Sequence, residues 1–128
     1  MRLTAAFLAN HAEIVDGMLN VEGAFWKTTT VAPGSTGFQC SAVVLCEMAS
    51  DDLGQQYSLH IDAEGPNGQR LAPAHSTDFT VEGQALFMCF PSIVLPIDPG
   101  GGRHLYTFRI AGQHERVDVP LAVRLQRA

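Results

Sequence analysis

Basic side chains are scarce in this chain of 128 residues, and the few present do not cluster along the sequence. Eight lysine and arginine residues stand against 13 acids, which gives a net charge of −5, and Lys27 is the only lysine. Proteins that bind nucleic acids need a basic footprint that displaces counterions from the phosphates. The composition therefore argues against nucleic acids as partners and, for the same reason, against anionic membrane surfaces.

The sequence also lacks a disulfide framework, a membrane-spanning run and a secretion signal. Its three cysteines, Cys40, Cys46 and Cys89, are too few and odd in number for a set of structural bridges. The longest apolar stretch, Ala85–Ile97, is too short to span a bilayer and is interrupted by prolines. The segment Met1–His11 has neither the full apolar region nor the cleavage site of a signal peptide. We expect a cytoplasmic protein whose thiols are buried as small hydrophobic groups.

Apolar residues are abundant by contrast. They make up 46% of the chain and charged residues only 16%, whereas soluble proteins average about a quarter charged residues. A single domain of this size, spanning residues 1–128, can bury a core without metals or disulfides. The low charge also leaves apolar surface for a partner.

Alternation of apolar and polar residues is the main structural signal. It is clearest in Tyr57–Glu64, Tyr106–Ala111 and Val117–Gln126, where each strand would have one dry and one wet face. This register predicts a set of buried side chains: Leu59, Ile61, Phe108, Ile110, Val119, Leu121 and Val123.

Weaker alternation predicts further strands at residues 3–7, 19–25, 38–48 and 77–81, and Asp16-Gly17 predicts a tight turn before the second of these. Only Asn10–Val15 is expected to be helical, for about one turn. Seven or eight short strands separated by turns favour an all-β fold, an antiparallel β-sandwich. Cys40 and Cys46 would then share the apolar face of one strand.

Two parts of the sequence resemble a known family. They consist of Thr4–Ala9, Asp16–Val21, Gly23 and Trp26, and of Pro99-Gly100, Tyr106–Ile110 and Gly112. Together they are similar to short bacterial proteins that are catalogued only as a domain of unknown function. Met18 stands where that family usually has lysine, and Glu22 stands at a position that is often apolar. The resemblance implies a compact β-sandwich and supplies no catalytic residues.

No motif for catalysis or for metal binding stands out. No serine lies in a G-x-S-x-G context, and no H-x-x-x-H or C-x-x-C spacing occurs. We therefore expect no catalytic residues and no cofactor, and we expect the five histidines to be solvated. Trp26, the only tryptophan, either fills the core or anchors a partner, and core filling is the preferred interpretation.

Acidic loops form the one constellation that could bind a metal. In an antiparallel sandwich alternate loops gather at one end, which would bring Asp16, Asp51 and Asp52 together, with Glu13, Glu82, His11 and His114 nearby. Calcium binds to several such oxygen ligands. Because no D-x-D-x-D loop occurs, a solvated acidic rim is the preferred interpretation, and the three aspartates are only candidate ligands.

The run from Leu86 to Leu95 is apolar on both faces, so it is either a central strand or covered by something outside the domain. It predicts an interface centred on Leu86, Met88, Phe90 and Val94, with Trp26 as a further candidate. The leading functional hypothesis is a non-enzymatic interaction or assembly module that either self-associates or serves as an accessory subunit. The alternatives are a binder of a small apolar ligand between two sheets and an enzyme with a dispersed loop site.

Overall fold

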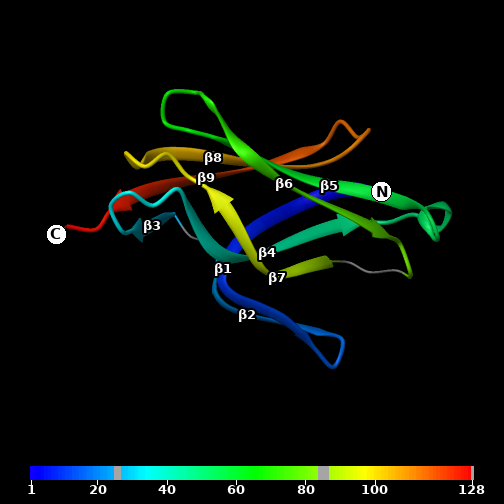
Figure 1. Cartoon of the computed structure of the whole chain (residues 1–128). Coiled ribbons are helices and arrows are strands. Elements are labelled where there is room, and N and C mark those ends of the chain that lie inside the picture. The colour runs from blue at the N-terminus through cyan, green and yellow to red at the C-terminus, as the bar shows by residue number, and fades with distance from the viewer. Residues whose placement is uncertain (25–26, 84–86, 128) are drawn as a thin grey trace.

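The computed structural model describes residues 1–24, 27–83 and 87–127, with the side chains of residues 72–74 outside that description. Within these ranges the chain is all-β apart from one short turn of 3-10 helix, η1 (Ser50–Asp52). The strands follow one another as β1 (Arg2–Val15), β2 (Met18–Ala24), β3 (Thr28–Val31), β4 (Gly37–Glu47), β5 (Gln56–Glu64), β6 (Arg70–Thr80), β7 (Phe87–Pro96), β8 (Gly102–Ile110) and β9 (Arg116–Leu125) (Figure 1).

Two sheets contain these strands. One is antiparallel, with the order β2-β1-β4-β7, and the other is mixed, with the order β3-β9-β8-β5-β6. The expectation of purely antiparallel pairing is wrong for one strand, because β3 runs parallel to β9, with Thr28 opposite Ala122. Strand β3 itself was not predicted. It is only four residues long, and its pairing partner lies far away in the sequence.

Both sheets contribute to one main core. Leu8, Val44 and Leu95 from the antiparallel sheet join Leu59 and Phe108 from the mixed sheet in a single buried cluster. The predicted register of β5, β8 and β9 is confirmed, because all the side chains expected inside are buried except Val119, which is half-buried. The main core therefore lies between apolar faces that the alternation of the sequence identifies.

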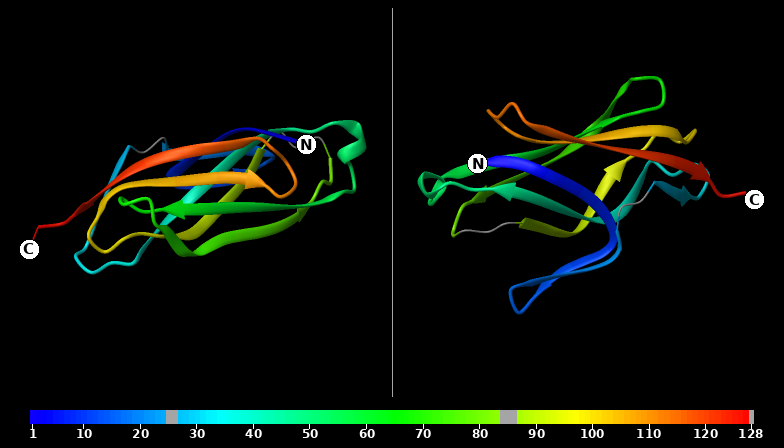
Figure 2. Two further views of the ribbon diagram at one scale, coloured as in Figure 1. Left: turned by 90° about the horizontal axis from the view of Figure 1, so that it is seen from above. Right: turned by 180° about the vertical axis from the view of Figure 1, so that it is seen from behind.

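Strand β1 is much longer than expected. Residues Asn10–Val15, predicted as a helical turn, continue the strand and pair with β2 instead. Asp16 and Gly17 have φ angles of 51° and 74°, so the predicted tight turn joins the two strands with positive φ at both central positions. The resulting β1–β2 hairpin projects away from the remaining strands in Figures 1 and 2.

Strand β7 is an edge strand of the antiparallel sheet, so the alternative of a central strand is wrong. Its two-sided apolar character has another cause. Met88 and Phe90 pack against the main core, whereas Cys89 packs against a second, smaller cluster that contains Phe7 and Val43. Apolar residues on both faces of this part of β7 therefore have intramolecular contacts.

Candidate functional site

The outer face of the mixed sheet carries paired charges. Asp62 on β5 lies between two arginines and accepts a hydrogen bond of 2.7 Å from Arg109 Nε and one of 3.0 Å from Arg70 Nη2. The hydrogen bond from Arg109, reinforced by the charges of both arginines, lowers the pKa of the Asp62 carboxyl. On the same face Thr107 donates a 2.8 Å hydrogen bond to Asp118.

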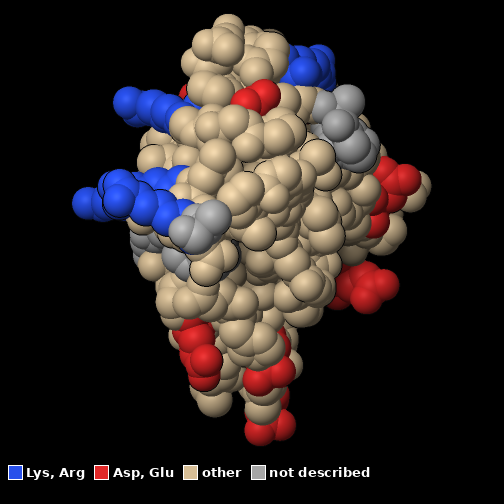
Figure 3. Space-filling view, turned by 60° about the vertical axis from the view of Figure 1, so that its left-hand side comes forward, with Lys and Arg blue, Asp and Glu red and all other residues tan. Residues whose placement is uncertain are grey.

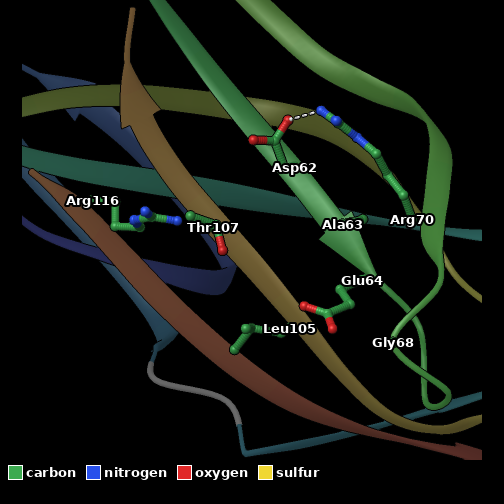
Figure 4. A pocket seen from close by; sticks show the side chains of 8 residues that line it. All are labelled: Asp62, Ala63, Glu64, Gly68, Arg70, Leu105, Thr107 and Arg116. Carbon is green, nitrogen blue, oxygen red and sulfur yellow. Dashed lines mark hydrogen bonds and ion pairs between the residues drawn. The ribbon is translucent and has the colours of Figure 1, made fainter. Parts of the chain in front are cut away.

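A shallow hollow of about 320 Å³ lies over this face, and Arg70, Arg116, Asp62 and Glu64 line it together with Leu105 (Figure 4). Figure 4 shows the Arg70 side chain reaching toward Asp62 across the sheet surface. Because both signs of charge line the hollow and Arg70 is paired with Asp62, the hollow has no strong preference for an anion or a cation.

Asp52 is the centre of a polar cluster at the start of β1. Its Oδ2 accepts a 2.6 Å hydrogen bond from the N-terminal ammonium and a 2.7 Å bond from the Ala49 N–H, while Tyr57 donates to Oδ1. These donors favour the ionised form and lower the pKa of Asp52 from 3.8 to about 2, the ammonium having the largest effect. The cluster ties η1 to the beginning of the chain.

The predicted gathering of Asp16, Asp51 and Asp52 is wrong. Asp52 contacts Met1, just before β1, whereas Asp16 follows the last residue of β1, fourteen residues further on. The prediction failed because residues 10–15 extend the strand instead of turning back. Across the described part of the chain, no group of three or more histidine, cysteine or acidic residues is placed to hold a metal ion.

The thiols lie on both sides of the antiparallel sheet. Cys40 and Cys46 are buried as predicted, with Cys40 in the main core, and half-buried Cys89 packs against the smaller cluster. Burial raises the pKa of Cys40 to about 12 and also raises the pKa values of Cys46 and Cys89. The reactive thiolate form is therefore strongly disfavoured at Cys40 and disfavoured at the other two.

His104 was expected to be solvated and is instead buried, with 1% of its surface exposed. Its Nε2 accepts a 2.9 Å hydrogen bond from the Asp98 N–H, and its Nδ1 lies 2.9 Å from the Gly102 carbonyl oxygen. This arrangement assigns the ring proton to Nδ1. The imidazole holds the turn between β7 and β8 closed, a structural task that the residue type alone does not reveal.

Ser41 links three strands where two ladders are interrupted. Strand β1 pairs with β4 only as far as Ala9 opposite Ser41, and the β4–β7 ladder shifts register at the same point. The Ser41 hydroxyl accepts a 3.0 Å hydrogen bond from the Ala12 N–H and donates a 2.6 Å bond to the Pro91 carbonyl. The Ser41 hydroxyl therefore satisfies the backbone N–H of Ala12, beyond the end of the β1–β4 pairing. It also satisfies the backbone carbonyl of Pro91, where the β4–β7 register shifts.

The predicted interface residues have different environments. Val94 is 65% exposed, whereas Met88 and Phe90 are half-buried against the main core. Leu86 and Trp26 lie outside the described residues. Among the described residues of the predicted patch, Val94 is thus the side chain most available to a partner.

Three other exposed apolar side chains gather at a place that the sequence reasoning missed. Ile14, Val15 and Met18, which we call the hairpin tip, are 53%, 43% and 67% exposed. Val15 lies opposite Met18 on one face of the hairpin, and Ile14 lies opposite Leu19 on the other. The signal was present in the sequence as apolar residues flanking a tight turn, but the helical interpretation of residues 10–15 concealed it.

Comparison with known proteins leaves the resemblance untested. No family model matches the chain, and no curated protein is significantly similar to it. The relation to the bacterial family and the cytoplasmic location therefore stay predictions. No helix within the described ranges is long and apolar enough to cross a membrane.

Proposed function

We propose that the chain is a single β-sandwich domain that works as a non-enzymatic interaction module, with the projecting β1–β2 hairpin as its contact element. The observation that carries this proposal is the exposure of Ile14, Val15 and Met18 at the end of a hairpin that projects beyond the other strands (Figures 1 and 2). Exposed apolar side chains that lie together, as Val15 and Met18 do on one face of the hairpin, are a common feature of protein contact surfaces.

Energetics favour a partner at this place. Fully burying a side chain such as Ile14 or Met18 contributes about 1.5–3 kcal/mol before the cost of association. Burial of these side chains on a partner would therefore supply binding energy.

Site-specific photo-crosslinking in the native host tests the proposal. A photo-reactive amino acid replaces Met18 at the hairpin tip in one variant and exposed Ser76 on β6 in a control. We expect a discrete protein adduct, either with another protein or with a second copy, from position 18 and not from position 76. Equal or absent crosslinking at the two positions would contradict the proposal.

A small apolar ligand between the sheets has less support. Side chains from both sheets fill the space between them, and Leu59, Tyr106 and Phe108 have no exposed surface. A ligand there would have to displace packed core side chains, which is costly in a densely packed interior.

A further inference from the structure

The β1–β2 hairpin carries negative charge along its length. Glu13, Asp16 and Glu22 are all exposed, and the segment from Asn10 to Ala24 contains no lysine or arginine. We call this segment the acidic hairpin. Its only other titratable side chain is exposed His11, which lies 3.6 Å from Glu13. The hairpin thus combines an apolar tip with acidic sides.

A groove of complementary character lies on the mixed sheet. It has a volume of about 370 Å³ and is lined by apolar Pro120, Leu121 and Ala122 with the cations Lys27 and Arg103; we call it the β9 groove. Both cations are exposed, and Arg103 lies opposite Ala122 in the β8–β9 ladder. Arg124, also exposed, is two residues beyond Ala122, so its side chain leaves the same face of β9.

The two features are separated in space. On the face drawn in Figure 3 the basic side chains lie in the upper part of the molecule, and acidic side chains line the projecting lower end. The two strands pair from His11 opposite Glu22 to Val15 opposite Met18, and the hairpin points away from β9 (Figure 1). A contact between tip and groove therefore needs two molecules.

We infer that the acidic hairpin of one molecule docks into the β9 groove of a second copy of the same chain. This inference rests on the proposed interaction function and identifies its partner. Apolar Ile14 or Met18 would contact Pro120 and Ala122, while Glu13 and Asp16 would face Lys27 and Arg103. Pairing of two hairpins with each other is disfavoured, because it would bring the three acids of each hairpin close to those of the other.

Such a contact is head-to-tail. Each molecule offers one hairpin and one groove, so the contact either closes reciprocally in a two-fold dimer or propagates into a larger ring or a filament. Two kinds of variant follow. Met18→Asp removes the hairpin function and leaves the groove intact, while the double variant Lys27→Glu/Arg103→Glu removes the groove function and leaves the hairpin intact.

Analytical ultracentrifugation of the purified full chain tests the inference. Wild type should form a dimer or larger species as its concentration rises, and each variant alone should be a monomer, with its association weakened at least tenfold. An equimolar mixture of the two variants should form a 1:1 heterodimer and nothing larger, because the mixture contains only one compatible hairpin and groove.

Matched controls are Leu53→Asp, at a side chain that is 60% exposed, and the double variant Arg2→Glu/Arg70→Glu, at exposed arginines outside the groove. Both controls should associate like wild type.

The outcomes separate the inference from the proposed function. A monomeric wild type overturns the inference, and a discrete adduct between position 18 and a different protein would still support the interaction function. A groove variant that still self-associates would place the contact outside the β9 groove, which also overturns the inference. Circular dichroism spectra of all variants should match wild type, so that loss of association is not loss of fold.

Discussion

Asp52 is the residue whose ionisation responds most clearly to its neighbours. Its pKa is lowered from 3.8 to about 2, so at intermediate pH the unfolded chain binds a proton that the folded chain does not. The stability that this carboxylate contributes is therefore fully present above about pH 4 and is lost as pH falls through about 2.

Urea denaturation at several pH values checks this expectation. Between neutral pH and pH 2 wild type should lose more stability than Asp52→Asn, which has no proton to bind at this position. Tyr57→Phe removes one hydrogen bond to Asp52, so its loss of stability between neutral pH and pH 2 should lie between those of wild type and Asp52→Asn. Parallel pH profiles for wild type and Asp52→Asn would show that this carboxyl does not couple to folding.

Ser41 should be the most sensitive of the hydroxyl side chains that bond to backbone. Ser41→Ala leaves the Ala12 N–H and the Pro91 carbonyl without their partner, and Ser41 and Ala12 are almost completely buried. We expect a loss of about 1–3 kcal/mol in the free energy of unfolding, measured in urea. Ser92→Ala serves as the control, because Ser92 is exposed and bonds only to the exposed Gln39, so its loss should stay within about 0.5 kcal/mol.

At the scale of the strands, the hairpin depends on the backbone at Gly23. Its φ angle is +61°, and a Cβ atom there would lie 2.2 Å from Asn10 Nδ2 and 3.2 Å from Asn10 Cβ. Gly23→Ala should therefore lower the free energy of unfolding by about 1–2 kcal/mol because of the backbone conformation alone. Steric crowding against Asn10 should lower it further.

Gly17→Ala provides the comparison, because Gly17 also has a positive φ but a Cβ atom there would meet open space. The loss in the free energy of unfolding for Gly17→Ala should reflect the backbone conformation alone, so it should be smaller than the loss for Gly23→Ala. The double variant Gly23→Ala/Asn10→Ala should recover part of the difference in urea denaturation. Equal costs at the two glycines would mean that Asn10 does not restrict the hairpin.

The sequence predicts strands well where one face is buried and the other is wet. Leu59 and Ile61 alternate with Ser58 and His60, and this pattern leaves only one register for β5. The prediction failed where the pattern is not local. Strand β3 gains its pairing from β9, and residues 10–15 have too few alternating positions to distinguish a strand from a helical turn.

The candidate site was harder to predict for the same reason. The hydroxyl of Ser41 meets a donor 29 residues away, and Asp52 meets the N-terminal ammonium across 51 residues. His104 is buried only because the β7–β8 turn closes around it. Such roles follow from tertiary contacts, whereas the hairpin tip could have been found from the tight turn at Asp16-Gly17 if residues 10–15 had been interpreted as a strand.

At the scale of the whole molecule, the arrangement of charge determines how salt acts on association. The net charge of −5 makes two copies repel each other on average, and salt screens this repulsion. If association used an uncharged apolar patch such as the one around Val94, added salt would therefore strengthen it. If the acidic hairpin docks beside Lys27 and Arg103, the charges that come closest attract each other, and salt weakens the contact.

The sign of the salt effect consequently distinguishes the two surfaces. We expect the dissociation constant of wild type, measured by sedimentation equilibrium, to rise when sodium chloride increases from about 0.05 M to about 0.5 M, over which the screening length falls from above 10 Å to below 8 Å. Val94→Asp should leave both the affinity and its salt dependence unchanged, because Val94 lies on β7 and lines neither the β9 groove nor the hairpin. Association that instead tightens with salt and is lost in Val94→Asp would assign the contact to the edge of β7, where the sequence first placed it.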